Sequence, residues 1–363
     1  GGASRTGMVH CSSCRVLSVW KAVGGMKEKR QQLAIYGAII LWRAIRKGSG
    51  HGYFAMHRGG ICMASLPDYA ELHCLSNFSF LRGAAHPEEL LKKAAAQGYK
   101  ALALTDECSL AGVVRAHLAA KASAMKFIVG SEMLIPQGDF LKGAVDGLKL
   151  VFLTCNRHGY GNLSALITLA RRRAEKGAYS LQRNDLEAFA PSGALPDCLV
   201  LWVPGEKVTV ADGLWLAERF PGRAWIAVEL HAGPDDAGRL ESLQALGAAC
   251  GLPLVAAGDV HMHVRARRPV QDVLTALRLK TTVFAAGYAL FPNGERHLRS
   301  RLRLSLLYPP ELLAETLVIA AQCNFSLDEL RYEYPEEIIP AGETASSWLR
   351  AETECGLLRR YPG

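Results

Sequence analysis

KALALTDECSLAGVVRAH, residues 100–117, is the stretch of this chain that decides its fold. Its first part, Lys100–Thr105, is an apolar run typical of a strand buried on both faces. Two carboxylates, Asp106 and Glu107, follow directly, and an alanine-rich helix is predicted over Leu110–Ala124. A buried strand that leads through polar residues into a helix is the repeating unit of α/β proteins with a parallel sheet.

The same unit recurs on both sides of this stretch. Pro87–Gln97 is predicted as a helix, because proline occupies its first turn, acidic residues follow, and Gly98 ends it. Seven strands within about 200 residues favour a closed barrel, in which functional side chains gather at the C-terminal strand ends. The other predicted elements are strands at Tyr69–Leu75, Lys126–Ile135, Lys149–Cys155, Leu199–Val203, Ala224–Leu230 and Pro253–Ala257, and helices at 162–174, 210–219 and 236–249.

Composition limits the class of protein. The 363 residues are 50% hydrophobic and carry a net charge of +8, which permits a nucleic-acid partner without requiring one. We find no apolar run of the roughly 18 to 20 residues that a membrane span needs, and no signal peptide. The ten cysteines are scattered, and Cys11–Cys14 has no second pair at zinc-ribbon spacing, so we expect reduced thiols and a cytoplasmic protein without a membrane partner.

Three regions are expected along the chain. Residues 1–66 are rich in Gly, Arg and Lys and are predicted to be a poorly ordered N-terminal extension. Residues 67–330 contain the regular strand and helix pattern, which becomes helical and basic after Val264 and includes an amphipathic helix at Glu311–Cys323. Residues 331–363 are predicted to form an extended linker and the beginning of another helix.

Side chains that can bind metals stand where the predicted strands end. Each has a simpler structural explanation: a single His is commonly hydrogen-bonded in a core, and Asp106 could cap a helix that begins near Ser109. Together, carboxylates and imidazoles at one barrel mouth would suit Zn²⁺, Mn²⁺ or Fe for the hydrolysis of a phosphate ester. The candidates are His73, Asp106, Glu107, Glu132, Glu229, His231, Asp259 and His261.

Long motifs in a fixed order resemble the PHP domain of bacterial C-family DNA polymerases. They include YAELHCLSNFSFLRGAAHPEELLKKA (69–94), KALALTDECSLAGVVRAH (100–117) and PLVAAGDVHMH (253–263). HMHVRARRPVQDVLTALRL (261–279) and NFSLDELRYEYPEEIIPAG (324–342) resemble the error-prone branch. The resemblance covers about residues 69–360. It implies an α/β fold, a distorted (β/α)7 TIM-like barrel of the PHP type, followed by the helical start of a truncated polymerase region.

The resemblance also implies a vestigial metal site. PHP enzymes have a His-x-His pair in the first motif, whereas this chain has His73 and then Leu75. Glu107 and Lys149 stand where such enzymes commonly have histidine, and a lysine ammonium repels a metal or substitutes for its charge. We expect a metal-free network between Lys149 and carboxylates, with a residual Zn²⁺ or Mn²⁺ site as the alternative. The positions that the resemblance assigns to the site are His73, Asp106, Glu107, Glu132, His231, Asp259 and His261.

The resemblance implies a parent DNA-directed DNA polymerase that acts on a primer–template and deoxynucleotides in damage-tolerant synthesis. Its Mg²⁺-binding carboxylates would lie outside this chain, which would be an inactive PHP scaffold. The primer–template and deoxynucleotides would be reached through other domains, and mutasome or sliding-clamp proteins are further expected partners. Two alternatives remain: a metal-dependent phosphoesterase or 3′–5′ exonuclease, and a purely structural interaction domain. Five arginines could contact DNA phosphates or form a solvated face: Arg171, Arg172, Arg173, Arg299 and Arg301.

Overall fold

Contacts divide the chain into two units, Gly1–Leu66 and Pro67–Gly363. In the first unit, β1 (Gly52–His57) and β2 (Gly60–Ser65) pair as an antiparallel hairpin, which the sequence did not predict. The remainder of the expected extension, with its CxxC pair, lies outside the described residues. The computed structural model describes residues 52–57, 60–136, 147–187, 194–205, 209–330 and 339–361.

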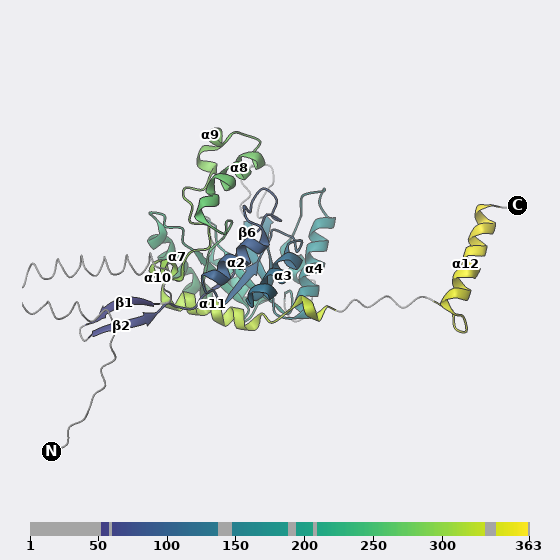
Figure 1. The fold of residues 1–363 in the computed structure, drawn as a ribbon, viewed down its shortest axis with the longest axis horizontal. Helices are drawn as coiled ribbons and strands as arrows, with labels where there is room; N and C mark the ends of the chain where they lie inside the picture. The colour runs from purple at the N-terminus through teal and green to yellow at the C-terminus, as the bar shows by residue number, and fades with distance from the viewer. Residues whose placement is uncertain are drawn as a thin grey trace, which may run out of the picture. The chain divides into compact units, whose positions relative to one another are not determined.

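The second unit is built on seven strands that follow one another around a barrel in chain order (Figure 1). The sheet closes between its first and last strands: the Leu75 amide donates to the Val260 carbonyl at 2.8 Å, and the Val260 amide donates to the His73 carbonyl at 3.0 Å. The predicted barrel is therefore confirmed. The strands are β3 (Ala70–Glu71), β4 (Ala101–Leu104), β5 (Lys126–Pro136), β6 (Gly147–Thr154), β7 (Cys198–Val203), β8 (Ala224–Glu229) and β9 (Leu254–Ala257).

The expectation of a fully parallel sheet is wrong at one strand. Strand β6 runs antiparallel to both β5 and β7, while the other neighbours in the barrel are parallel. Only residues 137–146 separate β5 from β6, and a parallel crossover needs a dozen or more residues. The beginning of β6 therefore lies at the end of the barrel where the parallel strands finish. We call this end the barrel mouth and the opposite end the barrel floor.

Burial on both faces explains why the strands lack polar alternation. Ala101 and Ala103 belong to the apolar cluster that fills the barrel, whereas Leu102 and Leu104 belong to the cluster shared with the surrounding helices. Both clusters are shielded from water, so both sets of positions favour apolar side chains. This double burial produces the continuous apolar runs seen in the sequence.

Helices follow most of the strands, close to the predicted positions. Helix α2 begins at Pro87, as predicted, and its Glu89 carboxylate accepts the His86 amide at 2.9 Å. Helix α3 begins at Val113, three residues later than predicted. The helices are α2 (Pro87–Ala96), α3 (Val113–Ser123), α4 (Arg157–Arg172), α5 (Arg183–Glu187), α6 (Val210–Arg219), α7 (Asp236–Cys250), η4 (Arg265–Arg267), α8 (Arg268–Arg278), α9 (Val283–Ala286), η5 (Gly287–Ala289), α10 (Arg301–Leu307), α11 (Pro310–Gln322), η6 (Leu327–Glu329) and α12 (Ala345–Arg360).

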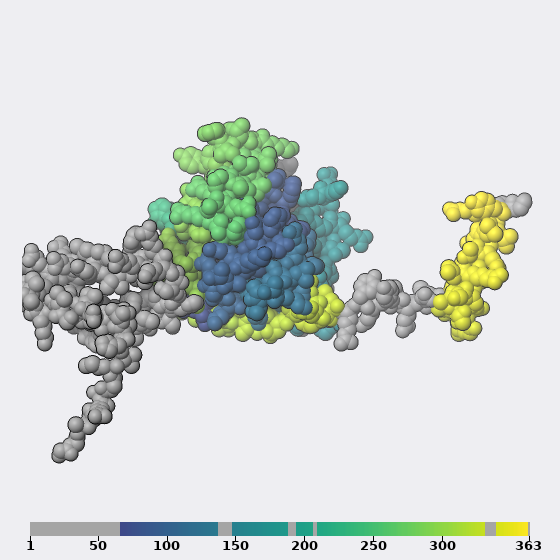
Figure 2. Space-filling model, in the orientation of Figure 1, coloured from purple at the N-terminus to yellow at the C-terminus, as the bar shows by residue number. Residues whose placement is uncertain are grey.

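Helix α11 covers the barrel floor. Its Thr316 hydroxyl accepts the amide of Ala70 at the beginning of β3, at 3.1 Å. Its Glu315 carboxylate accepts the indole N–H of Trp225, near the beginning of β8, at 2.8 Å. Helices α8 and α9 stand at the opposite end of the barrel from α11 (Figure 1). In the space-filling view, α2 and α3 form one continuous blue surface above α11 (Figure 2).

The last described helix, α12, has no buried residue. The Thr344 hydroxyl caps its first turn by accepting the Ser347 amide at 3.2 Å. Among the residues that the structure describes, no helix combines the length and the apolar character that crossing a bilayer requires.

Candidate metal centre

His73 lies at the centre of the barrel mouth and is fully buried. Its Nδ1 atom is 2.7 Å from Glu229 Oε1, and its Nε2 atom is 2.7 Å from Glu132 Oε2. The two carboxylates come from β8 and β5, on opposite sides of the ring. The closure of the barrel places His73 between these two carboxylates, because the His73 carbonyl accepts the backbone amide of Val260, which follows β9.

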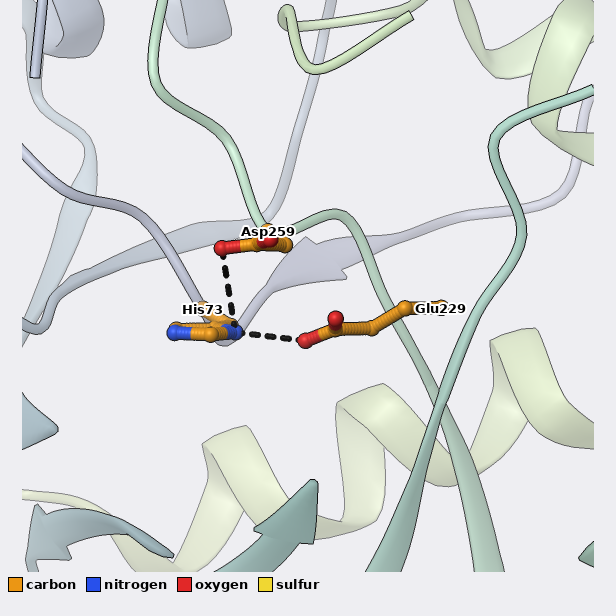
Figure 3. Close-up of side chains that lie close together, drawn as sticks. All are labelled: His73, Glu229 and Asp259. Carbon is orange, nitrogen blue, oxygen red and sulfur yellow. Dashed lines mark hydrogen bonds and ion pairs between the residues drawn. The ribbon is translucent and has the colours of Figure 1, made fainter. Parts of the chain in front are cut away.

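Asp259 completes a group of three possible metal ligands (Figure 3). Its Oδ1 atom lies 3.8 Å from His73 Nδ1, and ligand atoms of His73, Glu229 and Asp259 all lie within 4.8 Å of one another. Asp259 has a left-handed backbone, with φ of 42°. A Cβ atom on the preceding Gly258 would meet the buried Glu71 carboxylate at 2.3 Å, so the turn that presents Asp259 requires glycine. This group could hold one metal ion.

Lys149 reaches the same site from the beginning of β6. Its Nζ atom lies 3.0 Å from Glu132 Oε2 and 4.0 Å from Asp259 Oδ1. Only the antiparallel direction of β6 places a residue near the beginning of a strand at the barrel mouth. The contact between Lys149 and carboxylates that the sequence predicted is therefore present.

Two arginines enter from loops. Arg82, between β3 and α2, binds Glu107 at 2.6 Å and also makes an ion pair with Glu132. Arg296 makes an ion pair with Asp259. Glu132 and Asp259 therefore each have an arginine partner, and such charge-assisted contacts are stronger than neutral hydrogen bonds.

The charges at the barrel mouth nearly cancel. Four carboxylates face three permanent cations, so one negative charge remains, and His73 neutralises it when both of its ring nitrogens carry protons. A buried cluster is stable only when its charges are paired in this way. The carboxylates are Glu107, Glu132, Glu229 and Asp259, and the cations are Arg82, Lys149 and Arg296.

The pKa shifts follow from this arrangement. Burial opposes ionisation of Glu132, but Lys149 and His73 hold the pKa of its carboxyl well below the usual range. Burial opposes ionisation of Glu229 as well, but His73, Lys149 and Arg296 together lower the pKa of its carboxyl. Burial and Lys149 disfavour a charged His73, yet Glu229 and Glu132 together raise its pKa. A protonated His73 between two ionised carboxylates is the state that these shifts favour.

Two of the other predicted ligands have structural roles in this arrangement. Both oxygens of the buried Asp106 accept hydrogen bonds from Ser76 and Ser79, including hydroxyl contacts of 2.7 Å. Asp106 therefore holds the loop after β3, and the idea that it caps a helix near Ser109 is wrong because α3 begins at Val113. Glu107 is held by Arg82 and accepts the Tyr179 hydroxyl at 3.0 Å.

The two remaining predicted histidines stand beside the group of three ligands. His231 Nε2 lies 3.2 Å from the Gly258 carbonyl, and burial together with Arg296 lowers its pKa to about 4. His261 Nε2 lies 3.1 Å from Asp259 Oδ1, and burial together with Arg82 lowers its pKa to about 3. Both are neutral at pH 7, so neither contributes to the charge balance.

The sequence-based site omitted three members of the network. Glu229 ends its strand and is one of the candidates from the sequence, but it is not among the positions that the resemblance assigns to the site. Arg82 and Arg296 carry no positional signal, since both reach the site from loops rather than from strand ends. Only the tertiary contacts identify them.

Two of the five arginines predicted to contact DNA are buried. Arg299 is 2% exposed and donates to the Leu230 carbonyl at 2.7 Å and to the Tyr308 hydroxyl at 3.3 Å. Arg301 is 8% exposed and makes an ion pair with Asp68 at 2.8 Å. These guanidinium groups are used inside the domain, so neither can reach a phosphate without unfolding its surroundings.

The three arginines at the end of α4 differ from one another. Arg171 donates to backbone carbonyls, including that of Cys108 at 3.1 Å. Arg173 binds both oxygens of Asp185 at 2.6 Å. Arg172 is exposed. Arg172 is therefore the member of the five whose environment suits the predicted contact with DNA.

The residues at the barrel mouth fit one metal ion but not several. His73, Glu229 and Asp259 fit a single ion. A cluster of several ions does not fit, because Lys149, Arg82 and Arg296 occupy the positions next to the carboxylates and supply the positive charge that such ions would supply. The finding agrees with the departures from the PHP motif at Leu75 and Lys149.

Comparisons with known proteins show which proteins this chain is similar to. Residues 71–194 match the family described as PHP domain. Over 82% of the chain, 80% of residues are identical to an error-prone DNA polymerase of Dechloromonas aromatica, and 58% to one of an Azoarcus species. A solved structure of a putative metal-dependent phosphoesterase from Bifidobacterium adolescentis aligns with 54% of this chain and 89% of its own, at 15% identity and a TM-score of 0.36.

The chain spans 28% of the length of the Dechloromonas relative and 29% of the Azoarcus relative. The similarity therefore concerns one segment of proteins that are several times longer. Residues 71–194 of this chain match a PHP domain, and about four fifths of its length is similar to one segment of proteins named error-prone DNA polymerase.

Proposed function

We propose that this chain is the PHP-containing segment of an error-prone DNA-directed DNA polymerase that extends primer–templates with deoxynucleotides in damage-tolerant synthesis. The observation that carries the proposal is the 80% identity to such a protein over 298 residues. The Mg²⁺-binding carboxylates of polymerisation would belong to the part of the relatives that this chain does not cover. Translesion synthesis, DNA repair, a cytoplasmic location and mutasome or sliding-clamp partners are parts of the same proposal.

Within that protein, we infer that the segment acts as a scaffold. The support is the paired barrel mouth, in which Lys149, Arg82 and Arg296 neutralise carboxylates. A network of this kind fixes the ends of several strands relative to one another and leaves few free charges for catalysis.

Primer extension tests the first proposal. The purified 363-residue chain is expected to incorporate no deoxynucleotide on a primed template with Mg²⁺, because polymerisation needs carboxylates that hold two metal ions in line with the primer. The full-length Dechloromonas relative, assayed at the same concentration, is the positive control. Incorporation by the chain alone, above a heat-denatured sample, would contradict the scaffold proposal.

A second candidate function is favoured by the group of His73, Glu229 and Asp259, which could hold one Zn²⁺ or Mn²⁺ ion. Such an ion would activate water and neutralise phosphate charge, as in a phosphoesterase or a 3′–5′ exonuclease. This chain would supply the ligands, while Lys149 and Arg296 would compete with the ion for the same carboxylates. The competition makes this the weaker of the two functions.

Metal analysis and an exonuclease assay separate the two functions. With Mn²⁺ present, we expect less than one ion per chain after desalting and no release of nucleotides from a 3′ end. The His261→Ala variant should behave in the same way, because His261 stands outside the group of three ligands. One bound ion per chain, together with nucleotide release that Glu229→Gln abolishes, would establish the phosphoesterase function instead.

A further inference from the structure

Two free thiols meet at the barrel floor, at the opposite end of the molecule from the candidate metal centre. Cys155 follows β6, and Cys323 follows α11. Cys323 belongs to the apolar cluster that fills the barrel, and Cys155 packs against the same cluster. The Asn324 amide donates to the Cys155 carbonyl at 2.8 Å, so the two backbones also run side by side.

This geometry meets the requirements of a disulfide. A disulfide needs two α carbons within about 7 Å and side chains directed toward each other. The backbone hydrogen bond brings the two backbones next to each other, and both side chains pack in the same apolar cluster.

We propose that Cys155 and Cys323 are a site of reversible thiol oxidation, where a peroxide converts the pair into a disulfide that ties α11 to the barrel.

The two thiols have complementary roles in this chemistry. Cys155 is half-buried and Cys323 is 2% exposed, so Cys155 is the thiol that meets an oxidant from solvent. The neighbouring Cys323 lowers the pKa of Cys155, despite its burial, and this favours the reactive thiolate. Cys323 also lines a cavity of about 290 Å³, together with Lys126 and Asn324. Redox-sensitive thiols commonly combine a low pKa, access to solvent and a neighbouring second cysteine.

The reaction balances with hydrogen peroxide as the oxidant. The Cys155 thiolate attacks one peroxide oxygen, the O–O bond breaks, and a sulfenic acid forms while hydroxide leaves. The Cys323 thiol then attacks that sulfur, so the S–S bond forms, the S–O bond breaks, and water leaves. The two thiols lose two electrons in total, and a dithiol reductant restores them.

A third thiol provides a matched control. Cys198 lies one strand away, opposite Thr154 in the β6–β7 register, and it is fully buried. Its Sγ atom already donates to the Gly159 carbonyl at 3.3 Å. Cys198 should therefore remain reduced under conditions that link the other two. Cys355, on α12, is exposed and reports whether the oxidant has reacted with accessible thiols.

Peptide mapping of the whole chain tests the proposal. The folded protein is treated with hydrogen peroxide, alkylated with N-ethylmaleimide and digested with trypsin without reduction. We expect peptide 150–157, which contains Cys155, to be linked to peptide 304–331, which contains Cys323. The linked mass should disappear with dithiothreitol and with either Cys155→Ser or Cys323→Ser, and it should persist with Cys198→Ser.

The wild-type map decides the matter even if a variant folds poorly. Oxidation of Cys355 with full alkylation of Cys155 and Cys323 would overturn the proposal. Oxidation of Cys155 to a sulfinic acid without the linked peptide, or linkage of Cys155 to peptide 184–207 through Cys198, would overturn it as well. A linked pair that also raises the thermal midpoint of the chain by several degrees would support it, because the cross-link closes a long loop of the unfolded chain.

Discussion

Replacing Arg299 with methionine is expected to lower the free energy of unfolding of the barrel by about 3–5 kcal/mol. Arg299 is almost completely buried, and its guanidinium donates to the Leu230 carbonyl and the Tyr308 hydroxyl. The same hydroxyl donates to the Ala257 carbonyl at 2.8 Å, so one side chain links the ends of β8 and β9. Methionine fills similar volume but leaves the buried Leu230 carbonyl without its donor, which carries the full desolvation cost.

Arg299 also supports a second buried charge. Glu71 lies under the barrel mouth, where burial raises the pKa of its carboxyl and the positive charge of Arg299 partly offsets that effect. Loss of Arg299 would therefore destabilise the ionised form of Glu71 in addition to breaking hydrogen bonds. This contribution adds to the expected loss because an uncompensated buried charge is more costly than an unpaired neutral group.

Urea denaturation, monitored by circular dichroism, measures this loss of stability as a lower urea concentration at the midpoint of unfolding. The control is Arg172→Met on α4, an exposed position where substitution usually changes stability by less than about 0.5 kcal/mol. Equal midpoints for the two variants would contradict the structural role of Arg299. A purely DNA-binding role predicts a different pattern, in which Arg299→Met weakens DNA binding and leaves the midpoint unchanged.

Replacing Lys149 with methionine is expected to increase the affinity of the chain for Mn²⁺ by at least roughly tenfold, or about 1.4 kcal/mol. The ammonium lies 3.0 Å from Glu132 and 4.0 Å from Asp259, where it competes with a divalent cation for the same oxygens. Removing it leaves an excess of negative charge around His73. Without metal, the same variant should be less stable by about 2–3 kcal/mol, because Glu132 loses a partner in a buried site.

Isothermal titration with Mn²⁺ and thermal unfolding with and without the ion measure the two effects. Lys100→Met is a matched control, because Lys100 also stands near the beginning of a strand, but of a parallel strand, and is therefore not at the barrel mouth. Its ammonium is 57% exposed and 3.4 Å from Asp68. We expect Lys100→Met to change neither Mn²⁺ affinity nor stability by much.

A double-mutant cycle tests whether Glu132 is the carboxylate that Lys149 stabilises. Glu132→Gln combined with Lys149→Met should show a coupling energy of about 1–3 kcal/mol, because the two charges are in direct contact in a buried site. Additive effects, or a Lys149→Met variant that takes up no more Mn²⁺ than the wild type, would show that Lys149 does not substitute for a metal ion.

Much of the barrel could be predicted from local patterns. The predicted helix at 87–97 and the strand at 100–105 lie within about a residue of α2 and β4, because proline, early acidic residues and a terminal glycine define a helix without long-range information. Continuous apolar runs likewise identify strands that are buried on both faces. The direction of β6 was missed, since an apolar run has the same appearance in parallel and antiparallel strands.

The candidate site was harder to predict. His73 and Asp259 were found because each stands just beyond a strand, whereas Glu132 lies inside β5 and was found because it matches a family motif. Asp106 satisfies the same rule, yet Ser76 and Ser79 occupy both of its oxygens. The rule gives the end of the barrel at which a side chain lies, but it does not give the direction of that side chain or the partners that loops bring to it.

The sequence by itself determined that this chain is an α/β barrel with a PHP domain, and that its metal site departs from the family at Leu75 and Lys149. These are properties of residue type and local order. Only the tertiary structure decided how the site is neutralised, because Arg82 and Arg296 arrive from loops and Lys149 arrives through the reversal of β6. Electrostatic pairing depends on distances between segments far apart in the chain, and no local pattern of residues records those distances.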